Sequence, residues 1–397
     1  MQTFGSFLVA ALAAGFASGS ATSSKSGTFE LKQTGMPKWN LRNGPQALAN
    51  AYSKYGKVVP DHVALAAANQ NAKKKKKKKH FKRGRGSVTA EPIMDDLEYL
   101  VNVHVGHNKQ FMRLDLDTGS SDLWVFSTET IDAGAQNKYS PKRSSTAKKM
   151  HGAHWKISYG DGSSCSGDVY TDHVTIGGLT VQNQAVESAR EVSRQFARGK
   201  GDGLLGLAFS SLNTVKPHKQ NTWFDNVKSQ LDDPVFVADL RHKVPGTYFF
   251  GFIPDTVKDV SYVDVDSSDG FWGFNASTSF GEVQGIADTG TTLLLLDDKT
   301  VEGYYADVKS AENDQQQGGF VFDCTETLPN FSFSVGGGNI TIPGELINYA
   351  QASDSKCFGG IQAAGNIPFS IFGDVALKAA HVVFDAGNNR LGWAQKK

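Results

Sequence analysis

From residue 97 onward, hydrophobic and polar residues alternate in short runs that are separated by glycines. In the segment 97–105 every second residue is apolar or aromatic, and residues 112–117 repeat the pattern. A period of two is typical of half-buried β-strands, because successive side chains of a strand point to opposite faces. The pattern therefore predicts a mainly β body that begins near Ser87.

Only a few segments carry helical signals, and all of them are short. Residues 45–55 are rich in alanine and leucine, which favour a helix. Thr222 and Asp225 form a capping-box pattern at the start of 222–231. Two aspartates precede the third candidate, residues 299–308. The expected fold class is thus mainly β with few short helices.

The first 86 residues lack the alternating pattern. Residues 1–21 contain an apolar run over 4–17 and end in small residues, which is typical of a secretory signal peptide. No Lys or Arg precedes the run, so an ordinary N-terminal helix is the alternative. The run is too short to span a membrane, and we expect no membrane anchor.

Charge divides the chain more sharply than its total of +1 suggests. Residues 1–85 carry 16 Lys and Arg against two acids, a net charge of +14, whereas the rest carries 25 against 38, a net charge of −13. The basic run Lys73 to Lys79 cannot pack in a core and must be solvated or paired with acids. Nucleic-acid binding is the alternative for this run, but no aromatic stacking platform adjoins it.

One motif occurs twice. Asp117-Thr118-Gly119-Ser120-Ser121 recurs as Asp288-Thr289-Gly290-Thr291-Thr292, 171 residues later. Each copy ends an apolar strand, precedes an apolar run, and is followed at a similar distance by two hydrophobic residues and a glycine, at 204–206 and 371–373. Two similar halves predict two lobes that meet at a pseudo-twofold axis.

The repeated motif suits acid–base chemistry. Gly119 and Gly290 permit a sharp turn and a close approach of the backbone, and a hydroxyl residue follows each glycine. If the axis brings Asp117 and Asp288 together, the two like charges resist joint ionisation, so the pair holds one proton. One carboxylate can then activate a water while the other protonates a carbonyl oxygen. Either turn alone reads equally well as an Asx-type turn that closes a strand.

The motifs together resemble the pepsin family of aspartic endopeptidases, and within it the secreted fungal branch. The resemblance rests on four ordered segments, 117–125, 157–163, 288–292 and 371–374. It implies a bilobal pepsin-like fold with a signal peptide at 1–21 and a basic pro-segment at 22–86. The N-terminal β lobe with its flap would comprise residues 87–258, and the C-terminal β lobe residues 259–397.

The resemblance also implies a role for each motif residue. Asp117 and Asp288 would be the catalytic pair, supported by Thr118, Gly119, Ser120, Thr289, Gly290 and Thr291. The two hydroxyls of Ser120 and Thr291 would bind the outer carboxylate oxygens, and Thr118 and Thr289 would brace the two turns. Flap and substrate-binding residues would be Tyr159, Gly160, Asp161, Ser163, Trp124 and Asp115. Tyr159 would reach Trp124 from the flap, although both aromatics also read as packing residues.

A peptidase of this kind would bind an extended peptide or protein, prefer hydrophobic side chains around the cut, and need no cofactor or metal. An aspartate at this place in the flap, Asp161, is similar to what is found in the fungal enzymes that accept a Lys residue before the cleaved bond, and it implies the same tolerance here. The pro-segment would lie across the acidic cleft as an intramolecular inhibitor of a secreted monomer and leave below about pH 5, where carboxylates titrate. Processing at Lys82-Arg83 is a second route. The alternatives are a pepsin-like binding protein without catalysis and a nucleic-acid binder.

The remaining signals are minor. Of the three cysteines, Cys324 and Cys357 can close one disulfide loop, which leaves Cys165 as a free and inert thiol. Three sequons are candidates for N-glycosylation, at Asn275, Asn330 and Asn339. The segment 201–206 fits G-x-G-x-x-G, but no βαβ pattern surrounds it, which argues against a dinucleotide site.

Overall fold

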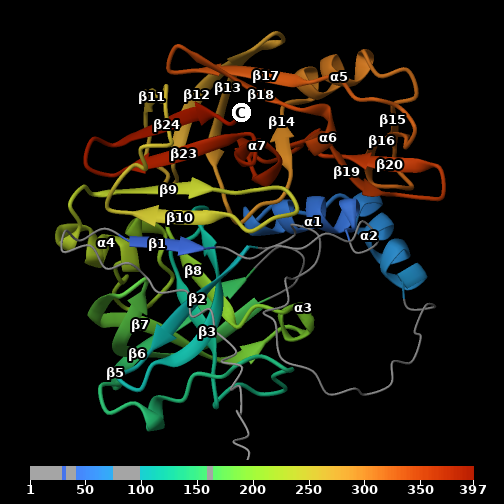
Figure 1. Ribbon diagram of the computed structural model, residues 1–397. Helices are drawn as coiled ribbons and strands as arrows, with labels where there is room; N and C mark the ends of the chain where they lie inside the picture. Colours follow the sequence, from blue (N-terminus) through green and yellow to red (C-terminus); the bar gives the residue numbers. More distant parts are fainter. Residues whose placement is uncertain (1–28, 33–41, 75–98, 159–163) are drawn as a thin grey trace, which may run out of the picture.

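The computed structural model describes residues 29–32, 42–74, 99–158 and 164–397 (Figure 1). It is mainly β with short helices, which confirms the expected fold class. The expected signal peptide, the dibasic pair, most of the lysine run and residues 159–163 of the expected flap lie outside the described residues. The proposed boundary near residue 258 remains a prediction.

A seven-stranded sheet forms the first lobe, in the order β2-β3-β8-β4-β7-β6-β5. Long strands β5, β6 and β7 follow one another as antiparallel neighbours, and β2 also pairs with β6. The bounds are β2 Leu100–Val105, β3 Gln110–Asp117, β4 Leu123–Phe126, β5 Lys148–Ser158, β6 Ser164–Ile176, β7 Leu179–Val192 and β8 Gly203–Gly206.

The second lobe holds another seven-stranded sheet, in the order β18-β17-β12-β13-β22-β14-β21, with a four-stranded sheet β15-β16-β20-β19 beside it. Bounds in the larger sheet are β12 Gly273–Thr278, β13 Gly281–Ala287, β14 Leu294–Leu296, β17 Phe331–Val335, β18 Gly338–Ile342, β21 Ile361–Ala363 and β22 Ser370–Phe372. In the smaller sheet they are β15 Glu312–Asp314, β16 Gly319–Asp323, β19 Asn348–Gln351 and β20 Lys356–Gly359.

A six-stranded sheet lies between the two lobes (Figure 1). Its order is β1-β10-β9-β23-β24-β11, so it joins strands from distant parts of the sequence. The strand β1 comes from the basic N-terminal segment and pairs with β10 at the sheet edge. Bounds are β1 Phe29–Lys32, β9 Val235–Asp239, β10 Thr247–Phe250, β11 Ser261–Asp264, β23 Ala380–Asp385 and β24 Arg390–Gln395.

The repeated motif sits on the same local topology in both lobes. In the first, β3 runs parallel to β8, with Asp117 opposite Gly206, and β4 returns antiparallel to β8. In the second, β13 runs parallel to β22, with Ala287 opposite Phe372, and β14 returns antiparallel to β22. Each motif turn therefore follows a strand, β3 or β13, that pairs in parallel with the strand of the hydrophobic-hydrophobic-Gly element, β8 or β22.

Three of the described helices, α1, α4 and α5, begin within one residue of the predicted positions, whereas the sequence analysis did not predict α2, the longest of them. Helix α1 follows its N-cap Asn43, whose side chain accepts from the amide of Gln46. Thr222 caps α4 and Asp297 caps α5 in the same way. The α-helices are α1 Gly44–Lys54, α2 Asp61–Lys74, α3 Arg194–Arg198, α4 Trp223–Val227, α5 Asp298–Ala306, α6 Gly344–Ile347 and α7 Asp374–Leu377; 3-10 turns lie at Pro141–Arg143, Ser210–Leu212 and Lys228–Gln230.

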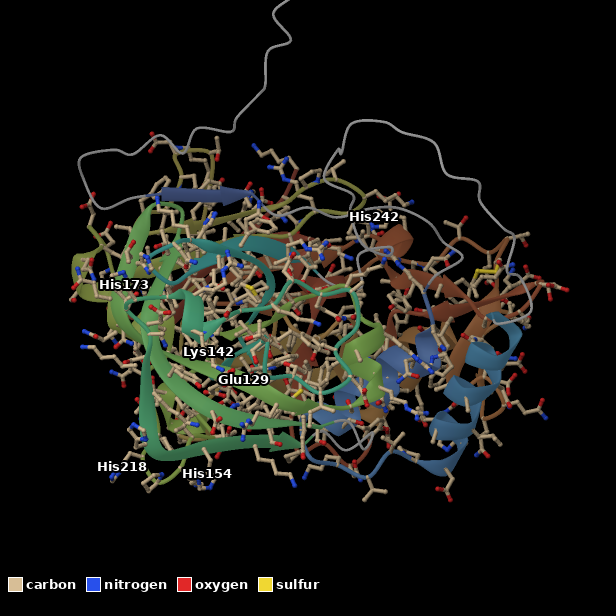
Figure 2. All side chains as sticks on the ribbon, turned by 90° about the horizontal axis from the view of Figure 1, so that it is seen from below. Glu129, Lys142, His154, His173, His218 and His242 are labelled. Atoms are coloured by element: carbon tan, nitrogen blue, oxygen red, sulfur yellow. A yellow bond between two sulfur atoms is a disulfide. The ribbon has the colours of Figure 1, made fainter. Side chains whose placement is uncertain are left out.

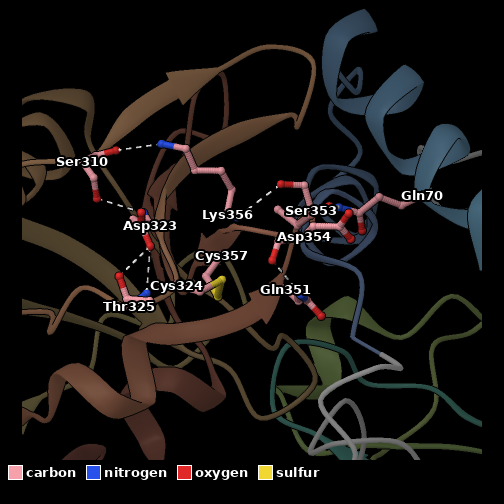
Figure 3. Close-up of a disulfide and its surroundings, with 11 residues drawn as sticks. Gln70, Ser310, Asp323, Cys324, Thr325, Gln351, Ser353, Asp354, Lys356 and Cys357 are labelled. Carbon is pink, nitrogen blue, oxygen red and sulfur yellow. Dashed lines mark hydrogen bonds between the residues drawn. A yellow bond between two sulfur atoms is a disulfide. The ribbon is translucent and has the colours of Figure 1, made fainter.

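The expected disulfide joins Cys324 to Cys357 across a sequence separation of 33 residues (Figure 3). Cys324 directly follows β16 and Cys357 lies in β20, next to the loop 352–355. Helix α2 approaches the same loop, where the Gln70 side chain donates to the carbonyl of Ala352 over 3.3 Å. Cys165 is a free, buried thiol, and burial raises its pKa, which disfavours the reactive thiolate; its inertness stays a prediction.

Candidate active site

The two motif turns touch at the junction of the lobes. A Cβ on Gly119 would lie 2.5 Å from Oδ1 of Asp288, and a Cβ on Gly290 would lie 2.3 Å from Oδ1 of Asp117. No side chain other than hydrogen fits at either position. Glycine at both turns is therefore what lets each aspartate reach across to the other turn.

Two threonines brace the turns reciprocally. The Thr118 amide donates to Thr289 Oγ1 over 3.0 Å, and the Thr289 amide donates to Thr118 Oγ1 over 2.9 Å. Each hydroxyl in turn donates to a backbone carbonyl of the other lobe, Ala287 over 2.9 Å and Leu116 over 2.6 Å. Both threonines are buried. The bracing fixes the two lobes at the point where the aspartates meet.

Each aspartate is oriented by its own turn. Asp117 Oδ1 accepts from the Gly119 amide over 2.8 Å, and its Oδ2 accepts from the Ser120 hydroxyl over 2.6 Å. Asp288 repeats the arrangement, with the Gly290 amide at 3.0 Å from Oδ1 and the Thr291 hydroxyl on Oδ2. The two carboxylates are almost fully buried, so they face each other in a low-dielectric site.

A lysine from the basic N-terminal segment lies between the two carboxylates. Lys54 Nζ is 2.7 Å from Asp117 Oδ1 and 2.7 Å and 2.8 Å from the two oxygens of Asp288. The neighbouring Tyr55 hydroxyl donates to Asp288 Oδ2. One ammonium thus contacts both acids at once, which shows that the aspartates converge on a single point.

The pKa values of the two aspartates are shifted in opposite directions. Burial raises the pKa of Asp117 despite the nearby Lys54 ammonium. Burial also acts on Asp288, but Lys54 together with the Thr291 and Tyr55 hydroxyls outweighs it and holds the pKa of Asp288 below its ordinary value. Burial alone would lower the pKa of Lys54, yet the two carboxylates raise it. Lys54 is therefore firmly protonated here.

The helix that delivers Lys54 packs on the second lobe. Residues 47–52 of α1 join Val63 of α2 in an apolar cluster with strands β14, β19 and β22. The Tyr55 ring lies edge-on to Phe271 and Phe369, with ring centroids 5.7 Å and 5.3 Å apart. The segment thus fills the space beside the aspartates with apolar side chains.

The comparison with a protein-family model decides the identity. Residues 98–396 match the model described as eukaryotic aspartyl protease. The chain belongs to this family.

Individual relatives support the assignment. The chain is 48% identical over 381 residues to aspergillopepsin-1 of Aspergillus fumigatus, covering 92% of each chain. It is 47% identical to penicillopepsin-3 of Penicillium janthinellum, again covering 92% of each. Endothiapepsin of Cryphonectria parasitica is 47% identical, with 93% of this chain and 91% of that protein covered. The recognition of a fungal pepsin-family aspartic endopeptidase is thus confirmed, and the chain is an enzyme of this class.

A solved structure confirms the pepsin-like fold. The aspartic proteinase from Irpex lacteus superimposes with a TM-score of 0.64 at 26% identity, covering 76% of this chain and 95% of that one.

The remaining expected site residues are Trp124, Asp115 and the flap residues, and the structure does not test their roles. Trp124 is buried in a cluster with Trp155 and Phe196, and its indole N–H has no hydrogen-bond partner among the described residues. Asp115 is half-buried in β3, opposite Leu204. Tyr159, Gly160, Asp161 and Ser163 lie outside the described residues, so the flap remains a prediction.

The sequence analysis also expected three N-glycosylation sites and no metal site. Asn275, Asn330 and Asn339 are all exposed, as attachment of a glycan requires. Within the described parts of the chain, no group of three or more His, Cys, Asp or Glu could hold a metal ion. Nor does any helix found in those parts have the length and apolar character to cross a membrane.

Lys54 and Tyr55 were missed by sequence reasoning. The family resemblance implies that a basic pro-segment lies across the acidic cleft, but residues 1–85 contain 16 Lys and Arg that could contact the aspartates. One signal was available: Lys54 and Tyr55 end the helix expected over 45–55, whose apolar residues give it a surface for packing. The lysine run at 73–79 carries far more charge, so charge alone does not single out Lys54.

The threonine brace leads to a stability prediction. Thr118→Val keeps the shape of the side chain but leaves the Thr289 amide and the Ala287 carbonyl without a partner. We expect it to lower the free energy of unfolding by about 1–3 kcal/mol, measured by urea unfolding at unchanged m-value. Thr118→Ser retains the hydroxyl and is the control. Equal midpoints for the Val and Ser variants would contradict this account of the brace.

Proposed function

We propose that this chain is a secreted, acid-active aspartic endopeptidase, made as an inactive precursor, in which Asp117 and Asp288 are the catalytic pair. The observation that carries the proposal is the convergence of both carboxylates on one point, which Lys54 Nζ occupies. Substrates are extended peptides or proteins, and the basic N-terminal segment 22–86 is the inhibitor. The protein acts as a monomer.

The chemistry follows from two acids that share a site. Without Lys54, the pair retains one proton because two adjacent buried carboxylates resist joint ionisation. A water between them loses a proton to the ionised carboxylate and attacks the peptide carbonyl, while the other carboxyl protonates the carbonyl oxygen. The proton then passes to the leaving amine. The amides and hydroxyls of the two turns hold the carboxylates in position throughout.

Specificity for hydrophobic residues is supported by the contacts of Tyr55. Its ring occupies a half-buried position between Phe271 and Phe369, immediately beside Asp288. Removal of the segment opens this apolar position next to the catalytic pair. Apolar pockets favour apolar side chains, so a hydrophobic residue of the substrate adjacent to the cut replaces Tyr55.

Secretion is supported by sequence and by the disulfide. Residues 1–21 have the composition of a signal peptide, and Cys324 is joined to Cys357, a bond that persists in oxidising compartments. The exposed sequon asparagines suit the same route.

The catalytic pair is tested by isosteric substitution. We expect Asp117→Asn and Asp288→Asn each to lower kcat for peptide hydrolysis at pH 3–5 by about 10²–10⁴-fold, the range for a lost general acid or base. The segment is removed beforehand by a separate protease at Lys82-Arg83. Asp115→Asn, two residues away on the same strand, is the control and should keep kcat within a few-fold. Full activity of either dyad variant would rule out the proposed mechanism.

The role of Lys54 is tested in the precursor. Breaking a buried ion pair costs about 3–5 kcal/mol, so Lys54→Met should weaken inhibition at pH 6, whereas Lys57→Met, three residues on, should not. Asp288 has a pKa below its ordinary 3.8 beside Lys54, so stabilisation by this pair is present above pH 3.8 and is lost as the pH falls through the lowered pKa.

We therefore expect the wild-type precursor to stay inactive near neutrality and to convert below about pH 5. Because the pKa of Asp117 is raised and that of Asp288 is lowered, the Lys54–Asp117 pair should weaken first, and the Lys54–Asp288 pair should persist until the pH falls through the lowered pKa of Asp288. Peptide hydrolysis and the mass of the product, followed from pH 7 to pH 3, measure the conversion. Equal activity of precursor and mature enzyme at pH 6 would argue against inhibition by this segment.

Asp161 provides a separate test of specificity. If its carboxylate contacts a Lys residue before the cut, Asp161→Ala should slow cleavage of a Lys-containing peptide about tenfold or more, as expected for a lost charge-assisted contact, and should leave cleavage of a matched Leu peptide unchanged. Equal cleavage rates of the Lys peptide by the wild-type and Asp161→Ala enzymes would contradict a contact between Asp161 and the Lys residue.

A further inference from the structure

A second pair of buried carboxyl groups lies close to the catalytic turn of the first lobe. Asp122 precedes β4, and Glu187 lies on β7 opposite Trp124. Both side chains are 1% exposed. They also share a donor, because the Asn213 side-chain nitrogen is 2.9 Å from Asp122 Oδ1 and 3.0 Å from Glu187 Oε1. The two carboxyl groups are therefore neighbours in the interior.

The donors around the pair are distributed unequally. Asp122 Oδ1 accepts from Asn213 and also from the amide and hydroxyl of Thr214, over 2.8 Å and 3.1 Å. Glu187 Oε1 receives only the shared Asn213 contact, and its buried Oε2 has no donor among the described residues. Three donors stabilise a negative charge on Asp122, whereas nothing comparable stabilises one on Glu187.

No buried cation among the described residues compensates for a second charge. The charged group on the surrounding loop that acts on Asp122 is Lys219, which is exposed and whose ammonium donates to the Ser211 carbonyl. Lys216 and His218 of the same loop are exposed. The remaining charged groups on adjoining strands have other partners: Asp202 with Arg113, and Asp168 with Lys149 and Arg190.

The pair is connected to the turn that carries Asp117. The backbone carbonyl of Asp122 accepts from the Gly206 amide over 2.9 Å, and Gly206 lies opposite Asp117 in the β3–β8 ladder. The Asn213 side chain that binds both acids also donates to the Ser121 carbonyl over 3.3 Å. A second charge at the pair would therefore strain the strand and loop that support the catalytic turn.

We propose that Asp122 and Glu187 share one proton, carried by Glu187 and donated to Asp122, and that loss of this proton as the pH rises destabilises the first lobe beneath the catalytic turn. The pair is then a pH-sensitive element that confines a stable first lobe to acid conditions. The proposal does not depend on the catalytic roles assigned above.

The direction of the pH effect follows from proton linkage. Burial and then the Asp122 charge hold the pKa of Glu187 well above its ordinary 4.5. The folded protein thus keeps a proton that the unfolded chain releases above pH 4.5. Stability from this group is fully present below pH 4.5, and as the pH rises toward the folded pKa the unfolding equilibrium constant increases about tenfold per pH unit.

The test compares urea unfolding at pH 4 to 7 of the full-length chain with Glu187 intact, called wild type in this test, and of Glu187→Gln, both carrying Asp288→Asn so that neither protein cleaves itself in acid. The Gln amide imitates the protonated carboxyl and can donate to Asp122 without titrating. We expect the wild-type and variant proteins to be similar at pH 4, and the variant to gain about tenfold in the folding equilibrium constant, relative to wild type, for each pH unit above 4.5. In infrared spectra at pH 6 the wild type should show a protonated carboxylic C=O band that the variant lacks.

Glu129→Gln is the matched control. Glu129, labelled in Figure 2, accepts from the hydroxyls of Tyr170 and Ser188, and no contact with a second carboxyl is found for it among the described residues. It should retain the wild-type pH dependence and the infrared band. If Glu187→Gln does not fold, Asp122→Asn decides the question, since it removes the charge on the other partner and should also flatten the pH dependence. Wild-type slopes in the folded variants, or no carboxylic band in the wild type at pH 6, would overturn the proposal.

Discussion

Two buried carboxylates that face each other across the lobe junction are the constraint on which this structure depends. Like charges at such a distance in a low-dielectric interior repel strongly, so the fold must hold them together by other means. The Thr118–Thr289 brace and the glycines of the two turns supply the geometry, and each carboxylate receives an amide and a hydroxyl. What these contacts do not supply is a positive charge, and Lys54 provides it.

A second pair of buried carboxyl groups in the molecule also brings two like charges close together. Asp122 and Glu187 are also buried together, but no lysine enters between them in the part of the chain that the structure describes. Burial favours protonation of a carboxyl, whereas an ammonium favours ionisation, so the two pairs respond to pH differently. A cation offsets one of the two negative charges of Asp117 and Asp288, and a proton is the remaining means of offsetting one charge at Asp122 and Glu187. Removal of the N-terminal segment would take the ammonium away from the first pair, whereas a change in pH is needed to remove the proton from the second pair.

Much of this arrangement was predictable from sequence because it rests on local patterns. Alternation of apolar residues gives the strands, the caps Thr222 and Asp297 locate two helices, and the repeated Asp-Thr-Gly motif locates the turns. Lys54 was not predictable by charge, because its position results from the packing of α1 on β14, β19 and β22. Glu187 carries no motif either. Its environment arises from Asn213 and Thr214, which approach it only in the folded chain.

Under the proposed function, the same lysine links inhibition to the chemistry that it prevents. While Lys54 is bound, Asp288 is held ionised and the pair has its compensating charge, so there is no need for a shared proton and no room for the water that must be activated. When the segment leaves, the pair loses one positive charge and must take up a proton in its place. If the segment is the inhibitor, acid supplies that proton and also weakens the ion pair, so that release of the segment and protonation of the aspartate pair are two consequences of one exchange, in which a proton replaces an ammonium.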